Sequence, residues 1–395
     1  MNDPGPGAPE LAVFGEWNTA NLGDRAIGRA ARAFFAECGW RATPYALGAL
    51  CRVAGADDGR APDGAFHALR LAGASGALKR RARAVRQRYR MLWLLGPLSR
   101  AQAIVVGGGG LLGDANLHFP QSLAAVATLA RALGKPLLCL GCGASGPWSE
   151  RGARLIGRFV AACRVVAVRD ARTAARLRAL GASPPPALFG DFCLAERDLR
   201  DDWPTDSRTT LALNVYAAPD QSGTGQERYE NAMVRLGRSL GGHDGRKLCV
   251  FTTGTSEDEA PARRVHARLP GASLHLPSGL DGLETLMRGG GLVVASRLHA
   301  AILALARGAA VLGCSPTSKL TDYLETMGLR EYAFGPDDVD ALARCVAREG
   351  CARLRAGQVG ALRRAPVWAG RADARRALEA LASGAAGAAR VDVTG

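Results

Sequence analysis

The stretch GGGLVVASRLHAAILALARGAAVLGCSPTSKLTDYLETMGL (residues 289–329) carries the clearest fold signal in the chain. A short apolar run over 292–296 has the pattern of a buried strand, and the helical pattern after it ends at Gly308. A second apolar run over 309–314 leads into another helical pattern. Two strand–helix units in direct succession predict neighbouring parallel strands, because a helix is the usual crossover between them.

The polar residues of this stretch fall where each strand passes into its helix. Arg297, Leu298 and His299 follow the first strand, and Ser315 to Lys319 follow the second. The carboxyl ends of parallel strands share one edge of a sheet, and helix N-termini bind anions through their free N–H groups. We therefore expect these residues to form a site for a phosphate and a carboxylate, with the Arg as a forked partner.

The same alternation of apolar runs and amphipathic segments extends over most of the chain. The other strand-like runs are 11–17, 103–108, 136–141, 165–170, 211–216 and 248–254. A polar, Pro-containing stretch at 195–209 interrupts the alternation, which then restarts. The pattern predicts an α/β fold of two doubly wound Rossmann-like domains, 1–200 and 205–395, that face a cleft as in GT-B glycosyltransferases. The C-terminal stretch from about 357 has a helical pattern that could cross back to the first domain, and the last dozen residues have the composition of a disordered tail.

Composition narrows the function without choosing it. A chain of 395 residues with 48% hydrophobic residues can fill two cores. The net charge of +15 suits anionic partners, whether nucleic acid, a membrane face or a phosphorylated substrate. The run RRARAVRQRYR (80–90) is either a nucleic-acid patch or a solvated helix face, and we favour the helix face. Aromatic residues make up only 6%, which argues against nucleic acid as a partner.

Cysteines and hydropathy indicate a cytoplasmic protein. The ten cysteines are scattered through a long chain and are expected to be reduced thiols. Cys139 and Cys142 form the one close pair, and no second pair or nearby His completes a zinc or redox site. The polar N-terminus is unlike a signal peptide, and Arg297, His299 and Arg307 argue against a membrane span in the most apolar stretch. We expect at most peripheral contact with the inner membrane face.

A second candidate segment is GEWNTANLGD (15–24), where a strand ends in a polar loop before a helix. Asn21 and Gly23 lie at the predicted helix start, and Gly23 would let the backbone come close to a ligand. Asp24 is either an acid beside that ligand or a carboxylate stabilised by the helix dipole.

A third segment, AIVVGGGGLLGDANLHF, places glycines directly after a strand. Gly108, Gly109 and Gly110 form a turn of the kind that α/β folds use at ligand sites. The segment lacks the GxGxxG spacing, so a nicotinamide enzyme is weakly supported. Asp114 and His118 follow within reach of the same edge.

A fourth segment, VVAVRDARTAARL, places Arg169 at a strand end and Asp170 at the cap of the next helix. Taken alone, Arg169 is as compatible with a structural role as with a functional one. If the two domains face each other, Arg169 and Arg297 would converge on one anion.

Taken in order, the four segments resemble the polysaccharide pyruvyl transferase family. The motifs that carry the resemblance are NLGD, GGGGLLGD, VAVRD and the late SRLH with its Lys-containing helix start, over about residues 11–330. The first loop departs slightly from the family pattern, since it is GEWNTANLGD here. Residues 40–100 and the C-terminal tail match nothing in the family pattern.

The resemblance implies a transferase that uses phosphoenolpyruvate as co-substrate and needs no cofactor or metal. It places the donor on Arg169, Arg297, Leu298 and His299, and it puts Asp24 and Asp114 near a sugar acceptor, lipid-linked or free. His299 would protonate the enol carbon, a sugar hydroxyl would attack C2, phosphate would leave, and a second hydroxyl would close a cyclic ketal.

Three alternatives remain open at this stage. A GT-B glycosyltransferase with a nucleotide-sugar donor would share the fold and the phosphate site. A basic nucleic-acid binder ranks last because aromatic residues are few. A family member that acts on a small-molecule acceptor would keep both fold and donor.

Overall fold

The computed structural model of the chain describes residues 5, 7–17, 19–53, 90–115, 117–144, 146–200, 210–217, 223–241, 247–288 and 291–384. These residues fall into two units, one comprising 1–19, 27–192 and 369–395 and the other 20–26 and 193–368. Residues 20–26 thus group with the second half of the chain, and the last helix groups with the first. Residues 201–209 of the interrupting stretch, residues 80–89 of the Arg-rich run and the final residues from 385 lie outside the described part.

The first unit is built on a sheet that, in the described residues, has seven strands in the order β3-β2-β1-β4-β5-β6-β7. These strands are β1 (Glu10–Gly15), β2 (Arg41–Ala46), β3 (Cys51–Arg52), β4 (Ala103–Gly107), β5 (Leu137–Cys142), β6 (Val165–Val168) and β7 (Ala187–Leu188). All neighbours pair in parallel except β3, which lies antiparallel to β2 at the edge.

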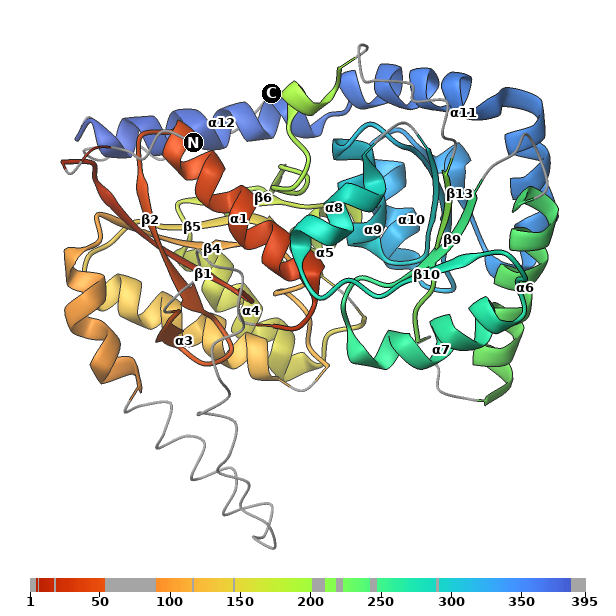
Figure 1. The fold of residues 1–395 in the computed structure, drawn as a ribbon. Helices are drawn as coiled ribbons and strands as arrows, with labels where there is room; N and C mark the ends of the chain where they lie inside the picture. Colours follow the sequence, from red (N-terminus) through yellow and green to blue (C-terminus); the bar gives the residue numbers. More distant parts are fainter. Residues whose placement is uncertain are drawn as a thin grey trace, which may run out of the picture. The chain divides into compact units, whose positions relative to one another are not determined.

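Helices cover both faces of this sheet (Figure 1). They are α1 (Leu22–Glu37), the helical residues 90–100, α3 (His118–Ala132), α4 (Glu150–Ala162), α5 (Ala171–Ala179) and α12 (Val367–Ala382). The crossover through α1 joins β1 to β2 and moves toward one edge of the sheet. The crossovers through α3, α4 and α5 join β4 to β5, β6 and β7 in turn and move toward the other edge. Because such crossovers are right-handed, α1 lies on the face opposite α3, α4 and α5.

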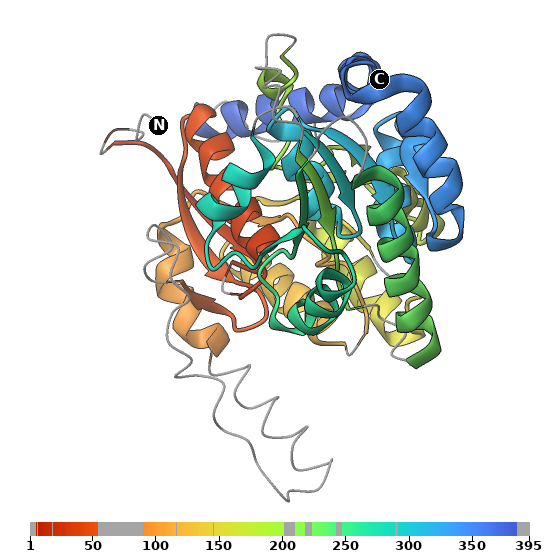
Figure 2. The same ribbon diagram turned by 45° about the vertical axis from the view of Figure 1, so that its right-hand side comes forward.

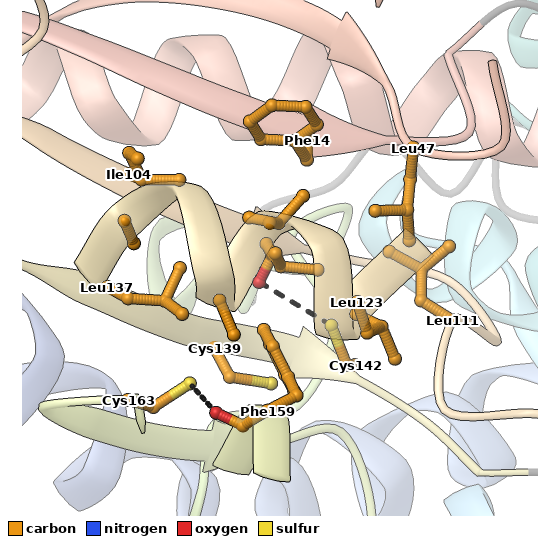
Figure 3. Packing of buried hydrophobic residues seen from close by; sticks show 14 of the residues in the cluster. Phe14, Leu47, Ile104, Leu111, Leu123, Leu137, Cys139, Cys142, Phe159 and Cys163 are labelled. Carbon is orange, nitrogen blue, oxygen red and sulfur yellow. Dashed lines mark hydrogen bonds between the residues drawn. The ribbon is translucent and has the colours of Figure 1, made fainter. Parts of the chain in front are cut away.

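The core under α3 and α4 is wholly apolar (Figure 3). Phe14, Ile104 and Leu137 from three neighbouring strands pack with Leu123 of α3 and Phe159 of α4, and all five side chains are buried. These strands are buried on both faces, which explains why they form continuous apolar runs rather than alternating ones.

On the opposite face, α12 returns to the first unit and closes it. The indole N–H of Trp40 donates to the Leu378 carbonyl at 3.1 Å, and Arg371 donates to the Asp191 carbonyl at 3.1 Å. The Arg371 guanidinium lies 5.0 Å from the ring centre of Phe189 and 5.2 Å from that of Phe34. On this face of the sheet, α12 therefore packs against a cluster of aromatic side chains.

The second unit has its own sheet, with six strands among the described residues in the order β10-β9-β8-β11-β12-β13. All of its pairs are parallel. The strands are β8 (Thr210–Asn214), β9 (Lys247–Phe251), β10 (Ser273–His275), β11 (Leu292–Ala295), β12 (Ala310–Cys314) and β13 (Ala333–Phe334).

Its helices again lie on two faces (Figure 2). They are α6 (Gly223–Gly241), α7 (Ser256–Ala267), α8 (Leu280–Met287), α9 (Leu298–Ala306), α10 (Ser318–Thr326) and α11 (Val339–Arg363), with short 3₁₀ turns at Glu196–Asp198, Arg330–Tyr332 and Pro336–Asp338. The predicted fold of two doubly wound α/β units is confirmed. None of the described helices has the length and apolar run that crossing a bilayer requires.

All eight apolar runs singled out in the sequence form strands, usually one or two residues shorter than predicted. Five strands were missed, namely β2, β3, β7, β10 and β13. Four of them are only two or three residues long. The fifth, β2, has six residues, but Thr43 and Pro44 interrupt its apolar sequence pattern. Short strands carry too few residues for a period to be recognised.

All ten cysteines lie in the described residues, none of them forms a disulfide bond, and eight are buried. Burial raises the pKa of the Cys314 thiol to about 12. The folded protein therefore keeps this thiol protonated at pH values where the unfolded chain ionises it. The resulting stabilisation is complete below pH 9 and is lost as the pH rises from there toward 12.

We predict that Cys314→Ala makes the stability less sensitive to alkali. Each thiol held protonated in this way costs about 1.4 kcal/mol of unfolding free energy per pH unit above its unfolded pKa. Urea unfolding at several pH values between 8 and 10.5 should give a shallower decline for the variant than for the wild type. The cavity left by the substitution lowers stability at every pH, so parallel profiles would contradict the prediction.

Candidate functional site

The strand order of the second sheet reverses between β8 and β11. The chain leaves β8 toward β9 on one side and leaves β11 toward β12 on the other. In open parallel sheets, ligands bind outside the carboxyl ends of the two strands at such a point. Tyr216 follows β8 there, Arg297 follows β11 and Ser315 follows β12. The sequence predicted two of these three residues as donor ligands.

Asn214, the last residue of β8, connects the two strands at this point. Its side-chain oxygen accepts hydrogen bonds from the backbone N–H groups of Ser296 at 3.3 Å and Arg297 at 2.8 Å. The hydroxyl of Tyr229 donates to Ser296 Oγ at 2.8 Å, and Ser296 Oγ donates to the Cys314 carbonyl at 2.7 Å. A buried polar network thus fixes the turn from β11 into α9.

Arg297 is paired more tightly than its sequence context suggested. Its Nε donates to Asp258 Oδ2 at 2.5 Å, and its Nη2 donates to Asp258 Oδ1 at 2.6 Å. Asp258 lies in the first turn of α7, is fully buried, and also accepts from the Ala217 N–H at 2.9 Å. One edge of the guanidinium is therefore occupied and its charge is balanced by a buried carboxylate.

His299 lies in the first turn of α9 and meets the NLGD loop. A Cβ atom at position 23 would lie 2.5 Å from Nδ1 of His299, so the glycine is needed for this close approach. The Leu22 N–H donates to the Thr253 carbonyl at 3.0 Å, which anchors the loop beyond the end of β9. The earliest and the latest of the four motifs therefore come together within the second unit.

The start of α1 follows the predicted pattern. The side-chain oxygen of Asn21 accepts a hydrogen bond from the Gly23 N–H at 3.0 Å. Asp24 lies half-buried in the first helical turn, where the helix dipole stabilises a carboxylate.

The helix starts after β11 and β12 have no side-chain cap among the described residues. Arg297 precedes α9 and Thr317 precedes α10, and neither side chain accepts from the first-turn N–H groups. Ser315 is buried, with its Oγ 3.2 Å from Thr317 Oγ1, while Lys319 is exposed and Leu298 half-buried. Uncapped helix starts suit an anionic ligand.

In the first unit, the glycine turn follows β4. This strand lies next to β1, and the strand order of the sheet reverses between the two. Gly108 and Gly109 have φ angles of 75° and 70°, which favour glycine, and a side chain on Gly108 would run into Ile27. Around Gly110 there is open space for a side chain. Nearby, Gly48 donates its N–H to Glu16 at 2.8 Å, and a side chain there would also meet His118.

Asp114 is held at the start of α4. Its Oδ2 accepts from the Ser149 N–H at 2.6 Å and from the Ser149 hydroxyl at 2.7 Å, and Ser149 in turn caps the helix. A side chain at Gly152 would collide with this carboxylate. Asp114 thus has a helix-capping role that the sequence did not reveal.

Arg169 is buried, with 4% of its side chain exposed. Its Nε lies 3.2 Å from Asp170 Oδ2, and its guanidinium packs against Gly143, where a side chain would overlap it. Asp170 caps α5 through the Thr173 N–H at 2.8 Å, as predicted. Arg169 belongs to the first unit and Arg297 to the second, so their convergence on one anion stays a prediction.

Sequence reasoning missed three residues of the second-unit site, Asn214, Tyr216 and Asp258. Asn214 and Tyr216 stand at the end of a predicted strand, the position that identified Arg297, and could have been found by the same rule. Asp258 comes from a helix separated from Arg297 by two strands and another helix, and no local pattern links the two.

We predict that Arg297→Met is more destabilising than Asp258→Asn. The first variant leaves a fully buried carboxylate without its partner, which typically costs about 3–5 kcal/mol. The second variant removes the buried charge. It leaves Arg297, whose side chain is 24% exposed, so that solvent can screen its charge. Urea unfolding measures both, and Arg348→Met, which breaks an exposed pair, should change stability by less than about 0.5 kcal/mol. Equal losses in the first two variants would show that the burial of Asp258 does not matter.

Comparison with solved structures supports the fold. The chain is similar to HepE of Anabaena in complex with UDP, at 10% identity and a TM-score of 0.56 over 94% of this chain and 100% of that one. A putative UDP-N-acetylglucosamine 2-epimerase from Listeria monocytogenes gives 13% identity and a TM-score of 0.57 over 94% and 96% of the two chains. An alpha-glucosyltransferase in complex with UDP and DNA gives 9% and 0.53 over 94% and 100%. These similarities show a GT-B-like fold and nothing finer.

Comparison by sequence identifies the family. No curated protein matches the chain. A family model described as polysaccharide pyruvyl transferase matches residues 21–318, a span that includes the NLGD loop, the glycine turn, Arg169 and the turn from β11 into α9. Because this match covers well over half of the sequence, the chain belongs to the polysaccharide pyruvyl transferase family.

Proposed function

We propose that this protein transfers the pyruvyl group of phosphoenolpyruvate to a pair of sugar hydroxyls and forms a cyclic pyruvate ketal. The observation that carries the proposal is the position of His299. It lies two residues after Arg297, in the first turn of a helix that has no side-chain cap among the described residues, and it touches the NLGD loop. A proton donor next to an anion site is what activation of an enol phosphate requires.

The proposed reaction begins with proton transfer from His299 to C3 of phosphoenolpyruvate. C2 then becomes an oxocarbenium-like centre, and a sugar hydroxyl attacks it as its proton goes to a base. The C2–O bond to the phosphate breaks, and inorganic phosphate leaves. A second hydroxyl of the same sugar adds to C2 and loses its proton, so the products are the ketal and phosphate. The helix starts at α9 and α10 supply N–H groups that stabilise the departing phosphate.

The test is incubation with phosphoenolpyruvate and a panel of lipid-linked, nucleotide-linked and small-molecule sugars, with products identified by mass. We expect release of inorganic phosphate that depends on the acceptor, and a product carrying a pyruvate ketal. Release of a nucleoside diphosphate from a nucleotide sugar, without use of phosphoenolpyruvate, would instead make the protein a glycosyltransferase of the same fold.

His299→Gln should remove most of the turnover and keep donor binding. Loss of a general acid typically lowers the rate by about 10²–10⁴-fold. Single-turnover phosphate release measures the chemical step, and titration with phosphoenolpyruvate measures binding. Normal turnover would exclude His299 as the acid, and loss of binding alone would make it a donor ligand.

Gly23→Ala should reduce turnover by displacing His299. The added Cβ would lie 2.5 Å from Nδ1 and 2.6 Å from Cβ of the histidine, so the ring must move. A misplaced catalytic group can cost about 10²-fold in rate. Gly360→Ala, in a helix of the same unit, is the matched control, because the nearest atom there is the flexible end of Arg364 at 3.7 Å. Equal activity of both variants would mean that the loop does not position His299.

A further inference from the structure

Tyr216 is a residue of the second-unit site to which the proposed reaction assigns no role. It follows the end of β8 and is 94% buried, since only 6% of it is exposed. Its ring lies 5.0 Å from the guanidinium carbon of Arg297 and packs edge-on against Tyr229, with ring centres 5.6 Å apart. Contacts on both sides therefore hold the ring in place.

The hydroxyl of Tyr216 is buried beside the hydroxyls of Thr317 and Ser315, yet it forms no hydrogen bond of normal geometry with any residue that the structure describes. Burial raises its pKa, while the nearby hydroxyls of Thr317 and Ser315 and the charge of Arg297 act in the opposite direction. The phenol is thus a protonated donor near the start of α10. Leaving such a group unsatisfied costs free energy, and a bound ligand would remove that cost.

The hydroxyls of Tyr216, Ser315 and Thr317 lie close together just before α10. Ser315 Oγ accepts from the Thr317 N–H at 3.2 Å and lies 3.2 Å from Thr317 Oγ1, so this turn is ordered before any ligand binds. The nine-residue helix α10 begins directly afterwards without a side-chain cap among the described residues. Hydroxyl and N–H donors suit a phosphate group, whose oxygens only accept in the ionised form, and the one carboxylate that acts on Tyr216, Asp258, is already paired with Arg297.

We propose that Tyr216, Ser315, Thr317 and the first turn of α10 bind the phosphate group of the donor and hold it as it leaves. The inference rests on the proposed function for the identity of the donor. Because Asp258 already occupies one edge of Arg297, neutral hydroxyl donors supply hydrogen bonds that this Arg edge cannot give. In the reaction, the C2–O bond breaks and its electron pair stays on the phosphate oxygen, where the Tyr216 hydroxyl donates a hydrogen bond.

The test is binding of inorganic phosphate to the full chain, measured by calorimetric titration without acceptor. Tyr216→Phe should weaken binding about tenfold, the loss expected for one hydrogen bond to a charged group. Ser315→Ala should act in the same direction, and the double variant should lose less than the sum of the two because they share one ligand. Tyr332→Phe is the control, because the hydroxyl of Tyr332 lies beside Gly357 of α11. The phosphate affinity of this variant should match that of the wild type.

The two proposals can fail separately. Unchanged phosphate affinity in Tyr216→Phe would overturn the phosphate site even if ketal formation is observed. Weakened affinity in a protein that releases a nucleoside diphosphate would keep the phosphate site and reject phosphoenolpyruvate as donor. Thermal unfolding of each variant separates loss of binding from loss of the fold, and a Tyr216→Phe protein that binds phosphate weakly only because it unfolds would also overturn the inference.

Discussion

The hydrogen bonds that the Asn214 side chain accepts from the backbone N–H groups of Ser296 and Arg297 connect β8 and β11, the two strands between which the strand order of the second sheet reverses. At such a point the helices leave toward opposite faces, and a gap opens beyond the strand ends. The buried side-chain amide of Asn214 connects the ends of β8 and β11 and fixes the direction in which the chain leaves β11. The direction of Arg297, the start of α9 and therefore the position of His299 all follow from this constraint.

The ion pair with Asp258 changes the electrostatics of this region. The chain carries a net charge of +15, yet the Arg at the centre of the site is balanced by a buried carboxylate. In the proposed phosphate site, attraction of the anion would depend on oriented N–H and hydroxyl dipoles more than on net charge. Dipoles held in place by a network need little reorganisation when charge develops on a leaving group, which is how preorganised sites stabilise transition states.

Much of the fold could be predicted from the sequence, because strands buried on both faces form long apolar runs that stand out between amphipathic segments. β4, β5, β11 and β12 are of this kind. β10 and β13 could not be found in this way, since edge strands of two or three residues have no period of their own. For the candidate site, the rule that ligands bind at strand ends predicted Arg297, His299 and Ser315, and the structure places all three where β11 and β12 end.

The same rule could not say what a strand-end residue contacts. Asp114 and Arg169 stand where ligand-binding residues are expected, and the structure gives both of them partners within the first unit. The partner of Arg297 comes from α7, and the contact of His299 comes from a loop near the N-terminus. Such pairings are long-range, so they become visible only when the chain is folded.

The return of α12 to the first unit affects how the protein is made. The described strands of that sheet are complete once β7 has been synthesised, but the aromatic residues Phe34 and Phe189 also pack against Arg371 of the last described helix. Domains generally fold in the order in which they leave the ribosome. Here the second unit, which lies between β7 and α12 apart from residues 20–26, can emerge whole while the first still exposes aromatic surface. The N-terminal unit is thus the first to leave the ribosome and the last to be completed.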